Sequence, residues 1–165
     1  MNTETFLQLG GYALFLGGSF ATLGWFLFAL FDPGHQEAGH SRWYPLNFLI
    51  ISGGLLMTLG LPGFYVLQAS QAGILGLFSF ILLFIGVAIP YLTIHAIETV
   101  TMPHVPASMM KFVSVGAPSL FLGLILTGVT TIRAGVYPST LGIALILSAL
   151  LRILTVIPGI PAWLG

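Results

Sequence analysis

The 165-residue chain contains no cysteine and only eight charged side chains, four basic and four acidic, so its formal net charge is zero. The missing cysteine excludes disulfide bonds, thiolate catalysis and cysteine-ligated metal. The balanced charge and the lack of a basic cluster argue against nucleic acid as a partner. Charged residues make up 5% of the chain, against roughly a quarter in soluble domains. Such a chain could not cover its own surface in water, and we predict an integral membrane protein.

The chain is instead rich in long apolar runs, and 57% of its residues are hydrophobic. A transmembrane helix needs about 20 mostly apolar residues. Five runs have this length, near residues 6–31, 45–67, 74–98, 112–132 and 139–157. We therefore predict an all-α fold, a polytopic membrane helix bundle of five transmembrane helices in one integral-membrane domain over residues 1–165. Four helices is the alternative number if one run is re-entrant.

Turn and proline signals divide the runs. We expect a tight turn over residues 68–73 and another over residues 133–138. Pro90 lies inside the third run and leaves the carbonyl of Gly86 without its backbone donor, so a kink is expected there.

Small residues recur at helical spacing, as in Gly10, Gly17 and Gly24 of the first run. In a bilayer, helices associate where small residues let their backbones approach closely. These faces are expected to close the bundle internally. The alternative is that one face, in the first helix, contacts another protein in a homo-oligomer or a larger membrane complex.

Titratable residues are distributed unevenly over the expected topology. Five crossings place the N-terminus and both tight turns on one side of the membrane. The opposite side, side B, receives ten of the twelve charged or histidine residues: Asp32, His35, Glu37, His40, Arg42, His95, Glu98, His104, Lys111 and Arg152. Any site is therefore expected to open on side B. Arg42 and Lys111 against Arg133 favour a cytoplasmic side B and an outside N-terminus.

The predicted ligand-binding residues are Tyr91, His95, Glu98 and Arg152. The first three are spaced four and three apart and share a helical face. Arg152 lies roughly 18 Å into the fifth run, at 1.5 Å per residue. A charge at that depth is costly. We expect a salt bridge with Glu98, the alternatives being a functional role and snorkelling of Arg152 to the membrane surface.

Imidazole and carboxylate groups on side B also suggest a metal site. Such groups suit zinc, iron or copper, and a single embedded histidine could ligate haem. The predicted metal ligands are His35, His40, His95, Glu98 and His104. Alternatively, these residues are polar only because they lie at the membrane surface.

Pro62 and Pro90 interrupt helices rich in phenylalanine, and a bundle loosened in this way could hold a lipophilic molecule such as a quinone, terpenoid, carotenoid or porphyrin. Motifs for covalent or hydride chemistry are absent from the sequence. We therefore expect a non-enzymatic protein of the lipid bilayer that binds a lipophilic ligand or cofactor or is a subunit of a larger membrane complex. The alternative is a membrane metalloenzyme or haem protein.

Residues 60–65, Gly-Leu-Pro-Gly-Phe-Tyr, are followed by Gln68-Ala69 and Ala72-Gly73. This pattern resembles uncharacterised small bacterial multi-pass membrane proteins over roughly residues 10 to 105. The resemblance implies a stand-alone helical fold in a bacterial cytoplasmic membrane, and it implies no activity.

Overall fold

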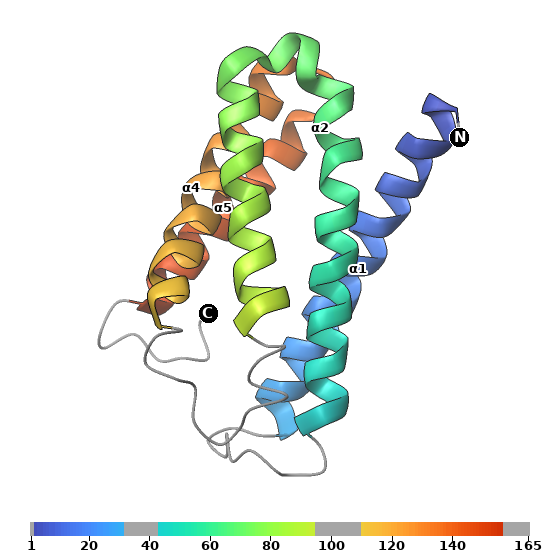
Figure 1. The fold of residues 1–165 in the computed structure, drawn as a ribbon. Helices are drawn as coiled ribbons and strands as arrows, with labels where there is room; N and C mark the ends of the chain where they lie inside the picture. The colour runs from blue at the N-terminus through green and yellow to red at the C-terminus, as the bar shows by residue number, and fades with distance from the viewer. Residues whose placement is uncertain (1, 32–42, 95–109, 157–165) are drawn as a thin grey trace. The chain divides into compact units, whose positions relative to one another are not determined.

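The computed structural model describes residues 2–31, 43–94 and 110–156. These residues are almost entirely helical, so the all-α prediction is confirmed (Figure 1). The elements are α1 (Thr3–Phe31), α2 (Trp43–Ala88), the π-helix η1 (Ile89–Ile94), α4 (Met110–Ala134) and α5 (Ser139–Val156).

The predicted number of five helices is not supported, because the described residues form four α-helices. The second and third apolar runs join in α2, an element of 46 residues, and the expected turn over residues 68–73 is helical as far as Ala72. Gln and Ala are good helix formers, so the helix continues through most of that segment. Within α2, Gly73 has non-helical backbone angles (φ 60°, ψ −154°), and the chain changes direction there (Figure 1). These angles are open essentially to glycine alone.

Three helical segments in the described residues are long and apolar enough to cross a membrane: Thr3–Phe28, Pro45–Thr93 and Ser114–Ala134. A fourth apolar helix, Ser139–Leu151, is shorter. Large apolar side chains are exposed along these segments, among them Phe15 and Phe48 at 73% and 70%. An apolar surface of this extent is unsuited to water and suited to lipid, which agrees with the predicted membrane location.

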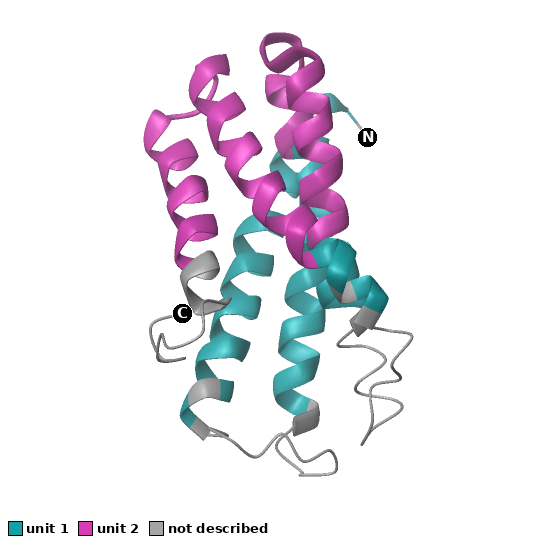
Figure 2. Ribbon diagram, turned by 90° about the vertical axis from the view of Figure 1, so that its left-hand side faces the viewer, with its two compact units in different colours: residues 1–63, 87–116 teal, residues 64–86, 117–165 magenta. Residues whose placement is uncertain are grey.

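The chain divides into two compact units, drawn in different colours in Figure 2. Unit 1 comprises residues 1–63 and 87–116, and unit 2 comprises residues 64–86 and 117–165.

In unit 1, α1 and α2 contact each other through glycines. A Cβ atom at Gly17 would lie 2.6 Å from the backbone N of Met57 and 2.7 Å from the carbonyl O of Gly53. A Cβ at Gly24 would lie 2.7 Å from a side-chain carbon of Ile50. The small-residue face of α1 therefore packs inside unit 1, in the internal role expected for it.

Unit 2 contains two helix contacts of the same kind, made through glycines. A Cβ at Gly123 of α4 would lie 2.5 Å from the backbone N of Leu83 in α2. Gly128 of α4 and Gly142 of α5 face each other, because a Cβ on either would lie 2.5 Å from the carbonyl O of the other. Close backbone approach thus brings α4 against both α2 and α5.

Pro90, where a kink is expected, lies in η1, in which the helix changes from α to π. Proline removes one backbone donor, and π segments commonly accommodate such interruptions.

Candidate functional site

One predicted site residue, Tyr91, has a described side chain. It lies in η1 in unit 1, is 9% exposed, and packs directly against Gly54 of α2. A side chain at position 54 would occupy the space of the Tyr91 ring, so Gly54 makes room for it.

The remaining predicted site residues lie outside the described part of the chain: His35, His40, His95, Glu98 and His104. Arg152 belongs to α5, but its side chain is not among those described. The metal or haem site and the Glu98–Arg152 salt bridge therefore stay predictions. Among the described residues, no group of three or more His, Asp or Glu side chains is placed to hold a metal ion.

Unit 2 contains a cluster of buried polar side chains, which we call the hydroxyl cluster. Its members are each at most 2% exposed: Gln68, Ser79, Thr127, Thr130 and Thr131. They come from α2, on both sides of Gly73, and from α4. A hydroxyl in an apolar helix can satisfy itself by donating to a carbonyl of the preceding turn. Ser79 Oγ donates to Gly76 O at 2.9 Å, and Thr130 Oγ1 donates to Thr127 O at 3.0 Å.

Two further contacts of the hydroxyl cluster connect α2 with α4. Thr131 Oγ1 donates to Gln68 Oε1 at 3.2 Å. Ser79 Oγ and Thr130 Oγ1 lie 3.4 Å apart, and either oxygen can be the donor. In an apolar surrounding such interhelical hydrogen bonds hold helices in register.

Thr127 differs from the rest of the cluster. Its Oγ1 is the one buried side-chain nitrogen or oxygen without a hydrogen-bond partner in the described part of the chain. A buried polar atom without a partner costs free energy.

Tyr137, in the connection between α4 and α5, contacts Phe64 of α2 within unit 2. Its ring stacks on Phe64 with centroids 4.8 Å apart, and its hydroxyl donates to Phe64 O at 3.3 Å. Partial burial removes water from the phenol and raises the pKa of Tyr137 above its ordinary value.

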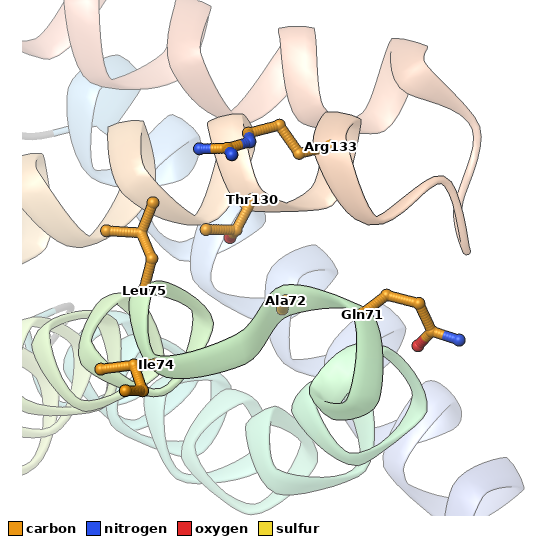
Figure 3. Close-up of a pocket in the computed structure, with 6 residues that line it drawn as sticks. All are labelled: Gln71, Ala72, Ile74, Leu75, Thr130 and Arg133. Carbon is orange, nitrogen blue, oxygen red and sulfur yellow. The ribbon is translucent and has the colours of Figure 1, made fainter.

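Beside Gly73 the structure contains a cavity of about 330 Å³, which we call the Gly73 cavity. Six residues line it, all in unit 2: Gln71, Ala72, Ile74, Leu75, Thr130 and Arg133. In Figure 3, Leu75 reaches toward α4, the Arg133 side chain runs along α4 above Thr130, and Gln71 points away from them. The cavity lies beside the break at Gly73 between two helical stretches of α2, and next to the last turn of α4.

The lining of the Gly73 cavity combines opposite chemistries. Ile74 and Leu75 supply an apolar wall, and Thr130 joins the cavity to the hydroxyl cluster. Arg133 is exposed and is the one charged residue of unit 2 whose side chain the structure describes. Its guanidinium makes no hydrogen bond or ion pair with any described residue. Arg133 lies in the last turn of α4, where a cation also offsets the negative end of the helix dipole.

None of the predicted site residues lines the Gly73 cavity. The distribution of titratable residues predicts a site on side B instead, and Arg133 enters that prediction only as a basic residue that favours one membrane orientation. One feature of the sequence does indicate this region: Arg133 is a rare cation at the start of the chain reversal expected over residues 133–138. No family model, curated protein or solved structure matches this chain.

Proposed function

We propose that the protein is a non-enzymatic membrane protein that binds a lipophilic small molecule in the Gly73 cavity. The observation that carries this proposal is the mixed lining of a cavity of about 330 Å³. Ligand sites are typically concavities of roughly 300–1,000 Å³ with mostly apolar walls and a few polar groups that fix orientation. Ile74 and Leu75 supply the apolar part of this lining, and the larger polar part comes from Gln71, Thr130 and Arg133.

The exposure of the apolar wall supports a ligand that comes from the bilayer. Ile74 is 88% exposed and Leu75 is 38% exposed, so a bound molecule could reach the cavity from the bilayer across these two side chains. A water-soluble ligand would leave this surface unused. The proposed ligand is therefore amphiphilic, with its apolar part against Ile74 and Leu75.

The proposed location is a bacterial cytoplasmic membrane with the N-terminus outside. The orientation is supported by the basic residues alone, since five crossings would put Arg42 and Lys111 on one side of the membrane and Arg133 on the other. The Gly73 cavity would then face the outer surface of that membrane.

Filling the cavity tests the proposal. The Leu75→Trp variant places a larger side chain in the cavity, and Leu77→Trp is the matched control, because Leu77 is similarly exposed at 44% and is not among the lining residues. The wild-type protein and both variants are purified in mild detergent, and the bound molecules are extracted and identified by mass spectrometry. We expect a lipophilic species with the wild type and Leu77→Trp that is strongly depleted in Leu75→Trp. Equal amounts in all three proteins would contradict the proposal.

A further inference from the structure

We infer that the Gly73 cavity recognises an acidic membrane lipid, with the Arg133 guanidinium binding the headgroup phosphate. This inference rests on the proposed function and adds the chemical class of the ligand. It depends on three observations: the charge of the cavity, its place at the end of an apolar helix, and the apolar surface that adjoins it.

The charge of the cavity selects an anion. Arg133 supplies the positive charge, and no other lining residue is ionisable. Because no described carboxylate neutralises it, a neutral ligand would leave the guanidinium without an ionic partner. A guanidinium presents several N–H donors in a planar fork that matches the oxygens of a phosphate in a bidentate arrangement. The hydroxyl of Thr130, at the wall of the cavity, donates its proton to Thr127 O and keeps lone pairs for a further polar contact.

The place of Arg133 in the chain fits the depth of lipid headgroups. The apolar segment Ser114–Ala134 is 21 residues long, which gives about 31 Å of helix at 1.5 Å per residue. This length matches the hydrocarbon thickness of a bilayer, roughly 30 Å. Arg133 is the penultimate residue of that segment, so in a membrane its side chain reaches the headgroup layer at one surface.

The neighbouring surface distinguishes a lipid from free phosphate. Ile74 and Leu75 follow Gly73 directly and begin the helical stretch that continues as apolar residues toward Ala88. An acyl chain attached to a phosphate bound at Arg133 would lie against the side chains of Ile74 and Leu75. Inorganic phosphate could pair with Arg133 but would gain nothing from the apolar wall.

Two simpler roles for Arg133 predict different behaviour. A cation that only offsets the α4 dipole, or that only anchors α4 at the membrane surface, acts through its charge and is indifferent to Leu75. A headgroup site instead requires both the guanidinium and the open cavity. The two kinds of role are therefore separated by changing each residue in turn.

The experiment measures lipid binding to the delipidated full chain by native mass spectrometry in detergent. The probes are phosphatidylglycerol, phosphatidylcholine with the same acyl chains, and inorganic phosphate. We expect the wild type to prefer phosphatidylglycerol, and Arg133→Gln to weaken its binding about tenfold, because losing a charge-assisted hydrogen-bonded pair has an effect of this order. Leu75→Trp should weaken the binding of both lipids.

Three controls make the result specific. Lys111→Gln removes an exposed cation in the first turn of the same helix and should leave the lipid preference unchanged. Arg133→Lys keeps the charge but loses the planar fork, so it should bind phosphatidylglycerol between the wild type and Arg133→Gln. The melting temperature of each variant checks folding, and if Arg133→Gln does not fold, the Arg133→Lys variant alone decides, with a loss of about threefold expected.

Four other outcomes would contradict the headgroup site or the proposed function. If Leu75→Trp loses lipid but Arg133→Gln and Arg133→Lys keep the wild-type preference, the headgroup assignment is wrong and the proposed function stands. If Leu75→Trp binds lipid like Leu77→Trp, the proposed function fails as well. If Lys111→Gln weakens phosphatidylglycerol binding as much as Arg133→Gln does, the effect comes from surface charge in general and not from a site at Arg133. Displacement of the lipid by equimolar inorganic phosphate would identify a free-anion site instead.

Discussion

At the scale of single residues, buried hydroxyls are the most informative feature of unit 2. Thr127 and Thr131 are one helical turn apart on α4 and are 2% and 0% exposed. Thr131 donates to Gln68, whereas Thr127 Oγ1 has no partner among the described residues. The same chemical group therefore has opposite energetic consequences at two neighbouring positions, since a buried hydroxyl stabilises only where it is hydrogen-bonded.

Replacing each threonine by valine, which has nearly the same shape, tests this difference. Thr127→Val removes an unpartnered hydroxyl and should leave the free energy of unfolding unchanged or raise it by up to about 1 kcal/mol. Thr131→Val removes a donor and leaves Gln68 Oε1 with an unmet acceptor, so we expect a loss of about 1–2 kcal/mol. Equilibrium unfolding in mixed detergent measures both. Equal effects of the two substitutions would show that the hydrogen bond to Gln68 does not stabilise the fold.

Tyr137 makes the stability depend on pH at the alkaline end. Burial raises the pKa of its phenol in the folded protein above the ordinary value of 10.0, so the folded state holds the proton more tightly than the unfolded state. The associated stability is complete below the unfolded pKa of about 10 and is lost as the pH rises through the folded pKa. We expect Tyr137 to cause no change in stability between pH 6 and 9 and to cause a decline above pH 10.

The Tyr137→Phe variant isolates the phenol. It keeps the ring that stacks on Phe64 and loses the hydrogen bond to Phe64 O, so it should be less stable than the wild type by about 1 kcal/mol at neutral pH. Above pH 10 its stability should fall less steeply than that of the wild type. Thermal unfolding over a pH series measures both effects, and parallel alkaline declines of the two proteins would rule out Tyr137 as the responsible group.

At the scale of elements, glycines determine where helices can meet. Gly17 and Gly18 are adjacent on α1, but a Cβ at Gly17 would lie 2.6 Å from Met57 N, whereas a Cβ at Gly18 would meet nothing within 4 Å. The first distance is far below a normal contact, and the neighbouring atom is backbone, which cannot turn aside. The packing of α1 on α2 within unit 1 therefore requires glycine at position 17 and not at position 18.

Alanine at each position makes a matched pair. Gly17→Ala should destabilise the protein by about 1–3 kcal/mol, because the added methyl forces the two backbones apart. Gly18→Ala should be neutral or stabilising by up to about 1 kcal/mol, since alanine is the better helix former. Unfolding in detergent again measures the difference. If Gly18→Ala proves as costly as Gly17→Ala, the α1–α2 contact is not the one described.

At the scale of the whole molecule, the apolar runs predict the helices well. Three helix bounds lie between described residues, namely the start of α1 at Thr3, the end of α4 at Ala134 and the start of α5 at Ser139, and they agree with the expected runs to within three residues. Polar or proline residues flank the runs at these places. The reversal inside α2 is harder to place from the sequence, since residues 68–72 are compatible with both helix and turn. Only the backbone of Gly73 departs from helical angles. The sequence contains no motif for the Gly73 cavity, because most of its lining consists of ordinary helix-forming residues, and the rare cation Arg133 is the one signal in that lining.

The succession of helices leads to a prediction for the membrane topology. If α1 crosses the bilayer once and α2 crosses once before Gly73 and once after it, Glu4 and Gln71 lie on the same side and Lys111 on the other, and α4 brings Ser139 back to the first side. Because the chain has no cysteine, a single cysteine can be placed at each of these four exposed positions without removing any other. A membrane-impermeant maleimide applied to sealed vesicles of one orientation should label cysteines at positions 4, 71 and 139 alike, and the cysteine at position 111 only after the vesicles are opened. Labelling of positions 4 and 71 from opposite sides would mean that α2 does not cross before Gly73. The Gly73 cavity would then lie on side B, the side that the titratable residues favour.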